Sequence, residues 1–333
     1  MMLAWVRTLI IACSLYAPMS AGFEIIAHRG ASGYLPEHTL AAATLAHSQR
    51  PDFIEQDVVM TKDHIPVVLH DIQLQDVTNV EQVFPDRHRA DQHFYAIDFT
   101  LAELRQLTIH ERHDAQGKAV FNQRYQGNGS GFHIATLAEH IELITELNRQ
   151  FAVNIGVYIE IKAPAWHRRQ GVDISDRVIT LIQQQVNPDM PVVLQCFDFG
   201  ETRRIRTSLK YQGQLMQLIG ENSWNESATD YDWLMSRAGL VQVAKVADGI
   251  GPWLPQIYEK TSAGNELDVP AWVAVARQHG LTIHPYTYRQ DALPDNLSGR
   301  SLIHYLQHTL EADGLFTDQV PAVKARLNDM AAD

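Results

Sequence analysis

Short runs of apolar residues alternate along this chain with longer stretches in which apolar positions recur at helical spacing. The runs predict β-strands at 24–27, 53–58, 66–70, 157–161, 192–196, 215–219, 247–250, 281–285 and 314–317. The longer stretches predict helices at 39–47, 136–149, 174–185, 231–242, 270–279 and 302–312. Strands separated by helices pair in parallel, through right-handed crossovers. About eight such units predict an α/β TIM barrel, with a doubly wound sheet as the alternative.

One connection is too long for this alternation. Residues 71–156 separate two predicted strands, whereas connections in compact domains usually have about 2–6 residues. Within this connection, 78–96 is rich in charge and histidine, 100–108 has a helical pattern, and 127–131 reads Gly-Asn-Gly-Ser-Gly, a flexible turn. We therefore expect residues 74–133 to form a small subdomain, inserted on the active face of the barrel.

The first 21 residues have the composition of a secretory signal peptide, with Arg7 before an apolar run and small residues near Ala21. We expect residues 22–333 to be a single exported domain located in the periplasm. Only five residues separate Arg7 from Cys13, so the apolar core is too short for a lipoprotein leader and no lipid anchor is expected at Cys13. Cys196 is then the only cysteine of the exported part, which predicts a buried core residue without a disulfide.

Composition and charge limit the classes of partner. Hydrophobic residues make up 45% and charged residues 20% of the chain, as in globular proteins. No stretch outside the leader reaches the roughly 18 apolar residues that a membrane span needs, so no stable membrane insertion is expected. A net charge of −12 argues against nucleic acid or an anionic membrane surface as partner. A small anionic substrate remains compatible with local cations, and the oligomeric state stays open, with a homodimer as one alternative.

Ionisable residues follow the predicted strands, and the active sites of barrels are built at strand ends. His28 comes directly after the strand at 24–27, and His70 ends the strand at 66–70, beside Asp71. Histidine transfers protons near neutral pH. We interpret His28 and His70 as an acid and base pair, one deprotonating a nucleophile and the other protonating a leaving alkoxide. The sequence does not assign the two roles.

Three carboxylates are predicted to converge nearby. Glu55 and Asp57 are two positions apart on one strand and therefore face the same side, while Glu160 lies near the end of another strand and precedes Lys162. Three adjacent carboxylates repel one another unless a cation offsets their charge. Oxygen-only ligation without cysteine favours Ca²⁺ or Mg²⁺ over Zn²⁺. From the residues alone, salt bridges between glutamate and lysine are an equal alternative to a metal site.

Other residues are candidates for binding substrate. Arg29 and Lys162 suit phosphate oxygens, the first through its planar fork and the second as a point charge. Glu37 could orient Arg29, bind a hydroxyl group or cap the helix at 39–47, and capping is the expected role of His38 and Thr39. Polar and aromatic residues at later strand ends could line an alcohol pocket or belong to the core: Gln195, Phe197, Trp253, Tyr286 and Phe316.

An ordered series of motifs runs through the chain: His28-Arg29-Gly30, Pro36-Glu37-His38-Thr39, Glu55-x-Asp57, His70-Asp71, Glu160-Ile161-Lys162 and Phe316-Thr317-Asp318. This series resembles the glycerophosphodiester phosphodiesterase family, specifically its periplasmic, calcium-dependent branch. The resemblance covers residues 23–328 and implies that His28 and His70 are catalytic. It also implies that Glu55, Asp57 and Glu160 bind the metal, and that the strand-end polar and aromatic residues surround a glycerol group.

The chain departs from the wider family at two positions near these motifs. His38 stands where many members have Asn, a change that suits the periplasmic branch. Asp76 stands where many members have Arg, which removes a positive charge near the rim of the site. Any role of that Arg in substrate binding is therefore not expected in this chain.

These features predict hydrolysis of glycerophosphodiesters, the deacylated head groups of phospholipids, to sn-glycerol 3-phosphate and an alcohol. Water and the substrate's glycerol 2-hydroxyl are alternative nucleophiles. A phospholipase of the same fold would need an apolar rim, and residues 77–96 are too charged to form one. A binding protein that retains only the barrel is a third interpretation, and the intact histidines and carboxylates argue against it.

Overall fold

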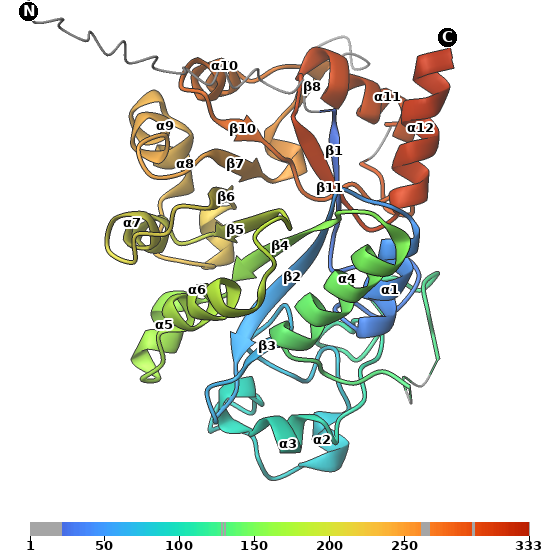
Figure 1. Cartoon of the computed structure of the whole chain (residues 1–333), viewed down its shortest axis with the longest axis vertical. Helices are drawn as coiled ribbons and strands as arrows, with labels where there is room; N and C mark the ends of the chain where they lie inside the picture. The colour runs from blue at the N-terminus through green and yellow to red at the C-terminus, as the bar shows by residue number, and fades with distance from the viewer. Residues whose placement is uncertain (1–21, 128, 130, 261–266, 295–296, 333) are drawn as a thin grey trace, which may run out of the picture.

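The computed structural model describes residues 22–332 apart from 128, 130, 261–266 and 295–296 (Figure 1). The predicted signal peptide lies outside these residues. Eight strands pair in parallel in the order β10-β7-β6-β5-β4-β2-β1-β11. Their bounds are β1 Glu24–Ala27, β2 Phe53–Met60, β4 Gly156–Ile161, β5 Val192–Cys196, β6 Gln214–Ile219, β7 Gly249–Pro252, β10 Thr282–Ile283 and β11 Gly314–Thr317.

The two ends of this sheet meet through residues that follow β10. The backbone N–H of Tyr288 donates to the Phe316 carbonyl at 2.8 Å, and the Asp318 N–H donates to the Tyr288 carbonyl at 3.2 Å. The sheet is therefore an almost closed parallel barrel, and the predicted TIM-barrel class is confirmed.

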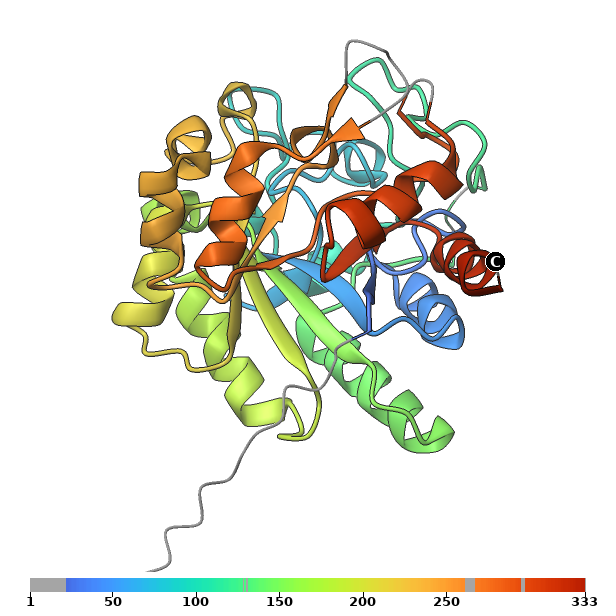
Figure 2. The same cartoon turned by 90° about the horizontal axis from the view of Figure 1, so that it is seen from above.

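Helices cover the outside of the barrel, as the view from above shows (Figure 2). They are α1 Leu40–Ser48, α4 Leu137–Phe151, α5 Pro164–Arg169, α6 Ile174–Gln185, α7 Phe199–Thr207, α8 Tyr231–Met235, α9 Arg237–Val243, α10 Ala271–Gln278, α11 Gly299–His304 and α12 Val320–Ala332. A π-helical turn, Tyr305–Thr309, continues α11. Two short 3₁₀ turns, Asn222–Trp224 and Leu254–Gln256, and the hairpin of β8 Glu259–Lys260 and β9 Leu267–Asp268 lie between these helices.

Local capping explains where several helices begin. Thr39 accepts a hydrogen bond from Ala42 N at 3.0 Å and so caps α1, as predicted. Thr136 and Glu139 form a reciprocal capping box at the start of α4. Asp198 caps α7 by accepting from Glu201 N. These caps satisfy backbone N–H groups that have no partner inside the helix.

Apolar side chains fill both sides of the barrel wall. The interior is closed by a small cluster whose members come from several strands: Ile26, Phe53, Tyr158, Val193, Met216 and Phe316. A larger core lies between the strands and the surrounding helices. Cys196 is fully buried and has a free thiol, as predicted. The packed interior leaves the strand ends as the place for a site.

The strand expected at 66–70 is shorter than predicted and is not part of the barrel wall. β3, Pro66–Val68, pairs antiparallel with the end of β2, with Val58 opposite Val68. The reason is the length of the connection, because residues 61–65 can form a hairpin but cannot hold the crossover that parallel pairing requires. His70 therefore reaches the site from a hairpin arm that extends β2.

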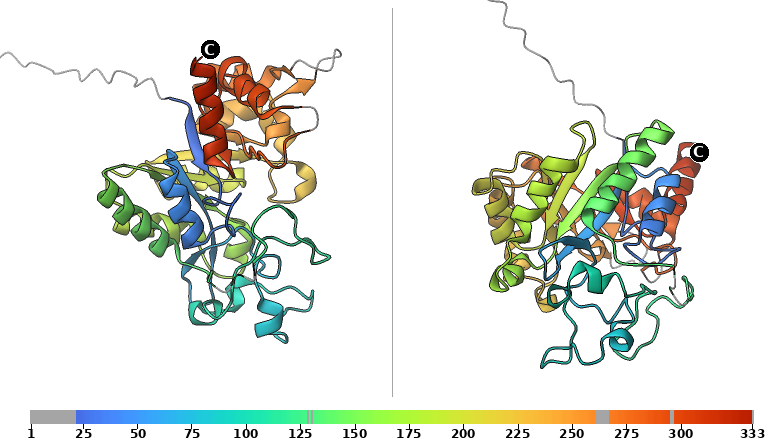
Figure 3. Two further views of the ribbon diagram at one scale, coloured as in Figure 1. Left: turned by 90° about the vertical axis from the view of Figure 1, so that its right-hand side faces the viewer. Right: turned by 60° about the horizontal axis from the view of Figure 1, so that its bottom comes forward.

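The segment 74–133 contains the short helices α2 Val80–Val83 and α3 Leu101–Leu104 and a 3₁₀ turn at Ala96–Asp98. In this segment, the part around α2 and α3 lies beyond the tip of β2 (Figure 3). The apolar side chains of the segment, including Leu74, Phe99, Leu104 and Leu107, form a second core together with residues of β3 and the end of β2. In the described part of the chain, no helix is long and apolar enough to cross a membrane.

Candidate active site

A cavity of about 210 Å³ opens at the carboxyl ends of the barrel strands. Most of the predicted site residues line it: His28, Arg29, Glu55, Asp57, His70, Glu160, Gln195, Phe197, Trp253, Tyr286 and Phe316. Four further residues line it that the sequence did not indicate: Leu218, Trp224, Thr287 and Arg289. Two predicted substrate-binding residues, Glu37 and Lys162, stand behind its wall and contact lining residues instead.

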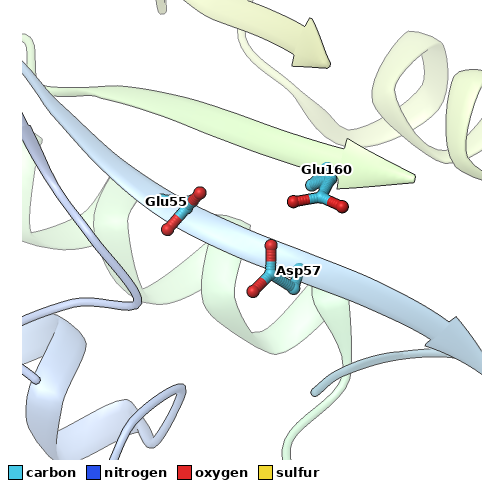
Figure 4. Close-up of side chains that lie close together, drawn as sticks. All are labelled: Glu55, Asp57 and Glu160. Carbon is cyan, nitrogen blue, oxygen red and sulfur yellow. The ribbon is translucent and has the colours of Figure 1, made fainter. Parts of the chain in front are cut away.

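Three carboxylates form one cluster in this cavity (Figure 4). Asp57 on β2 is the register partner of Glu160 on β4, and Glu55 lies two residues earlier on β2, so all three point to the same side. One oxygen of each lies within 4.8 Å of an oxygen of the others. All three residues are at most 5% exposed. The parallel register of two adjacent strands therefore builds the cluster.

The cluster is electrostatically unfavourable without a cation. Burial and the neighbouring carboxylates Asp57 and Glu160 raise the pKa of Glu55 well above its usual value. Burial, helped by Asp57, raises the pKa of Glu160 to about 8. Asp57 Oδ1 is buried and has no hydrogen-bond partner among the described residues. Oxygen donors that converge, repel one another and leave an acceptor unpaired fit a hard divalent cation.

His38 supports this cluster, although the sequence suggested a capping role for it. Its Nε2 lies 2.7 Å from Asp57 Oδ2, and the residue is 1% exposed. Burial acts to raise the pKa of Asp57, but His38, together with His70 and Lys162, outweighs burial, and that pKa lies well below its usual value. The chain folds back here because the His38 N–H donates to the Arg29 carbonyl at 3.0 Å. The Asn-to-His departure from the family pattern thus lies beside a candidate metal ligand.

His28 is oriented by Asp318. Its Nδ1 lies 2.6 Å from Asp318 Oδ1, while its Nε2 lies 3.7 Å from Glu55 Oε2 and 3.5 Å from Thr287 Oγ1. A carboxylate only accepts hydrogen bonds, so Nδ1 is the donor and Nε2 is left facing the cavity. Burial and the adjacent Arg29 lower the pKa of His28 to about 4. The ring is therefore neutral at pH 7.

His70 has the same arrangement with Asp71. Its Nδ1 lies 2.7 Å from Asp71 Oδ1, and the side chain is 27% exposed. Burial, together with Arg29 and Lys162, lowers the pKa of His70 below its usual value. Two imidazoles with lowered pKa values, each with Nδ1 beside a carboxylate, thus line one cavity.

Arg29 is held by a tight turn at the end of β1. Its φ of 56° and the φ of 80° at Gly30 lie in the left-handed region. A Cβ at Gly30 would come within 2.9 Å of the Ala42 carbonyl carbon, so only glycine fits. The Arg29 N–H donates to Glu55 Oε2 at 2.9 Å, and its Nη1 donates to Glu37 Oε2 at 2.9 Å. Glu37 therefore orients Arg29, one of the roles suggested for it.

Lys162 and Gln195 contact the carboxylates from behind. Lys162 Nζ lies 2.8 Å from Glu160 Oε1 and 3.2 Å from Glu226 Oε1. Gln195 Nε2 donates to Glu55 Oε1 at 2.9 Å. Both side chains are buried, and both hold candidate metal ligands in place. Gln195 also lines the cavity, whereas Lys162 does not, and direct contact with substrate stays a prediction for both.

Aromatic rings line part of the same cavity. Phe197 and Tyr286 pack edge to face with centroids 5.9 Å apart, and Trp224 and Trp253 do so at 5.1 Å. The Tyr286 hydroxyl donates to the Ile219 carbonyl, which fixes its ring. Phe316 lines the cavity and also belongs to the barrel core. The wall is apolar and rigid, which suits the carbon skeleton of a small alcohol.

Sequence reasoning missed several residues that complete this site. Asp318 belongs to a motif of the sequence that gave it no role; its backbone carbonyl accepts from Gly33 N, and its carboxylate accepts from His28. Arg112 and Arg124 lie in the long connection and carry no local signal that they reach the barrel. Glu226 lies in the loop after β6, and no local sequence pattern indicated that it would reach the site. Their proximity to the histidines is set by tertiary packing alone.

The fold and the cavity define a TIM-barrel protein with paired histidines and a candidate metal site. Residues 28–322 match the Glycerophosphoryl diester phosphodiesterase family. A glycerophosphodiester phosphodiesterase of Haemophilus influenzae is 38% identical over 316 residues, covering 88% of this chain and 86% of the relative. One of Treponema pallidum is 34% identical over 302 residues, covering 84% and 85%. The chain therefore belongs to the glycerophosphodiester phosphodiesterase family.

Solved structures agree on the fold. The phosphodiesterase of Oleispira antarctica, in complex with the product sn-glycerol-3-phosphate, superposes with a TM-score of 0.63 at 20% identity, covering 92% of this chain and 96% of that one. A protein of Silicibacter pomeroyi gives a TM-score of 0.71 at 22% identity, covering 93% and 95%. The barrel is thus shared with structures whose sequences have diverged widely.

Proposed function

We propose that this protein hydrolyses glycerophosphodiesters to sn-glycerol 3-phosphate and an alcohol. The observation that carries the proposal is one cavity, in a member of this family, lined by His28, His70 and the cluster of Glu55, Asp57 and Glu160. The Haemophilus influenzae and Treponema pallidum relatives are named for this activity. The Oleispira antarctica enzyme binds sn-glycerol-3-phosphate as its product.

The three carboxylates hold a divalent cation, which we assign as Ca²⁺, with Mg²⁺ as the alternative. Oxygen-only ligation and three buried acidic side chains support this assignment. The bound cation supplies Lewis-acid stabilisation of charge on the phosphate oxygens. Arg29, whose Nε has no hydrogen-bond partner among the described residues, contributes a further positive group beside the cluster. Lys162 adds charge from behind Glu160 and reaches phosphate less directly.

The two histidines exchange the protons of the reaction. One accepts a proton through Nε2 from the nucleophile, which is water or the glycerol 2-hydroxyl. A P–O bond to the nucleophile forms as the P–O bond to the alcohol breaks, and the other histidine, which enters this step as an imidazolium protonated on both ring nitrogens, gives its Nε2 proton to the departing oxygen and becomes neutral. Attack by the 2-hydroxyl gives a cyclic phosphodiester that water then opens. The lowered pKa values of His28 and His70 suit the role of proton acceptor.

The glycerol group occupies the aromatic side of the cavity. We assign its contacts to Gln195, Phe197, Trp253, Tyr286 and Phe316 and place Glu37 behind Arg29 as its orienting partner. The apolar rings would exclude water, while Arg29 lies beside the carboxylate cluster, where a bound cation would help to offset the charge of the phosphate. This arrangement accepts a small alcohol on one side of phosphorus.

We further propose that residues 1–21 are a signal peptide, that residues 22–333 form one periplasmic domain, and that 74–133 is a subdomain inserted into it. The leader composition supports export, and the second core supports an inserted unit. The periplasmic, calcium-dependent branch of the family fits these features. The partner is a small glycerophosphodiester rather than nucleic acid or membrane.

The test compares two substrates. Wild-type protein and H70A, each shown to be folded by circular dichroism, are assayed for glycerol 3-phosphate release from glycerophosphocholine and for alcohol release from lysophosphatidylcholine. We expect turnover of the deacylated substrate alone and its loss in H70A. Preference for lysophosphatidylcholine would favour a phospholipase, and no turnover of either substrate would favour a binding protein.

A further inference from the structure

Two arginines of residues 74–133, which we call the 74–133 segment, reach into the active-site region. Arg112 Nη1 lies 2.6 Å from Asp71 Oδ2, and its Nη2 lies 2.6 Å from Glu37 Oε1. The side chain is 16% exposed. Arg112 therefore joins the carboxylate that contacts His70 to the carboxylate that contacts Arg29.

Arg124 makes an equivalent contact on the other side. Its Nη2 lies 2.7 Å from Asp318 Oδ2, and its Nε lies 2.8 Å from Asp291 Oδ2. The Arg124 side chain is 4% exposed and that of Asp318 is 2% exposed. Arg289 from the barrel also donates to Asp318 Oδ2, at 2.8 Å.

The two sets of contacts have the same geometry. In each, one carboxylate oxygen faces the Nδ1 of a histidine and the other oxygen faces an arginine of the 74–133 segment. A carboxylate fixed at both oxygens cannot rotate about its Cβ–Cγ bond, so the imidazole that it holds keeps its orientation and its Nδ1–H tautomer. Nε2 then remains the atom that exchanges protons with substrate.

The pKa shifts of Asp71 and Asp318 agree with this geometry. Burial acts to raise the pKa of Asp71, but His70 and Arg112 outweigh it and hold that pKa well below the usual value. The pKa of Asp318 is also held well below its usual value. There, Arg289, His28 and Arg124 together outweigh burial. Both carboxylates are thus ionised acceptors at neutral pH.

We propose that Arg112 and Arg124 are positioning residues, one for each histidine, and that the 74–133 segment completes the active site by supplying them. The inference rests on the proposed phosphodiesterase function for its kinetic consequences, and on geometry alone for its structural ones. It explains why a segment with its own core is tied to the barrel at both histidines. Arg112 has a second effect through Glu37, because that carboxylate orients Arg29.

The kinetic experiment uses R112Q, R124Q and a matched control, R105Q. Arg105 also belongs to the 74–133 segment and pairs with Glu139 of α4 at 2.6 Å, but this pair is exposed and distant from the histidines. Each variant is assayed on glycerophosphocholine and on the p-nitrophenyl ester of glycerol 3-phosphate. Choline departs only with a proton, whereas p-nitrophenolate departs without one.

We expect R112Q and R124Q to lower kcat on glycerophosphocholine by on the order of 10- to 100-fold, because a small misplacement of a catalytic group can cost this much. If the replaced arginine positions the histidine that acts as general acid, the variant regains activity on the p-nitrophenyl ester. If it positions the general base, the variant is impaired on both substrates. R112Q also raises KM, through Arg29. R105Q stays within about twofold of wild type, as expected for an exposed ion pair.

A spectroscopic measurement separates this inference from the proposed function. The imidazole Nδ1–H signals of His28 and His70 are assigned in ¹H–¹⁵N spectra by their loss in H28Q and H70Q. R112Q should shift the His70 signal and leave that of His28, and R124Q should do the reverse. If wild type is inactive but these shifts occur, the phosphodiesterase function fails and the positioning role stands. Unshifted signals, or equal losses on both substrates in both variants, would overturn the positioning role.

Discussion

Asp57 joins the candidate metal site to the buried histidine beside it. One of its oxygens is unpaired and faces the carboxylate cluster, and the other lies 2.7 Å from His38 Nε2. Partners behind a ligand fix its rotamer and so its affinity for the metal. His38 does not line the cavity, so it acts on the candidate metal site through Asp57.

Replacing His38 should therefore weaken cation binding. We expect H38A to lower Ca²⁺ affinity by about 10- to 100-fold, the usual effect of losing such a partner, as measured by isothermal titration calorimetry. H47A is the matched control, since His47 on α1 is equally buried but its Nε2 lies 3.0 Å from Asn148 Oδ1 on α4 rather than beside a carboxylate of the cluster. Equal Ca²⁺ affinities in H38A and wild type would contradict the role given to His38.

Residues next to predicted strands could be placed from the sequence, and those in long loops could not. His28, Glu55 and Asp57 lie on or directly after strands, so their direction follows from the barrel. Arg112 lies 41 residues from its partner Asp71, and Arg124 lies 194 residues from Asp318. No local pattern encodes such pairs, because the path of the segment between them decides the contact.

β1 links the two ends of the barrel, since its last residue precedes His28 and its first residue, Glu24, lies at the opposite end. Burial, with Asp52 and Asp313, raises the pKa of Glu24 from 4.5 to about 7. Between these two pH values the folded protein binds more protons at this group than the unfolded chain does. Ionised Glu24 therefore costs stability, and this cost grows as the pH rises toward and through 7.

E24Q removes this titration while keeping the shape of the side chain. We expect its melting temperature to exceed that of wild type by more at pH 8 than at pH 5, measured by differential scanning calorimetry. E146Q, which changes an exposed glutamate of α4, should show no such difference. An E24Q effect that is the same at both pH values would exclude a raised pKa at Glu24.

Element boundaries followed the sequence where apolar runs were distinct. The predicted strands at 24–27, 192–196 and 314–317 match β1, β5 and β11 in full. α7 was not predicted, because Phe199 and Ile205 are the two large apolar residues among its nine. Two such positions are too few to give a helical periodicity. The helix predicted at 231–242 divides at Ser236, whose side chain caps α9. Apolar periodicity therefore predicts that a stretch is helical, but it does not show where a capping residue divides the stretch into two helices.

The described part of the molecule has a second large hydrophobic core beside that of the barrel, formed by the 74–133 segment with β3 and the end of β2. The barrel supplies the histidines and carboxylates, and the 74–133 segment supplies Arg112 and Arg124 from its own core. A substitution that loosens the packing of the second core should therefore displace Arg112 and Arg124 and lower kcat. A comparable loss of packing elsewhere on the barrel should leave kcat unchanged.

L107A tests this coupling. Leu107 is fully buried in the second core, and its truncation should cost about 2–5 kcal/mol of unfolding free energy. We expect kcat to fall as well, because Arg112 and Arg124 lose their fixed positions. L240A, a fully buried position on α9, should lose comparable stability in urea unfolding yet keep kcat in the folded protein. Equal kcat values in the two variants would separate the second core from catalysis.

The most direct measurement is release of glycerol 3-phosphate from glycerophosphocholine by residues 22–333. It is made with Ca²⁺, with a chelator, and with H28A in the presence of Ca²⁺. We expect release that requires Ca²⁺ and is lost in H28A, because the carboxylate cluster and His28 line the same cavity. Release that persists in chelator, or in H28A, would contradict the account of the site, and no release by folded wild-type protein would contradict the activity itself.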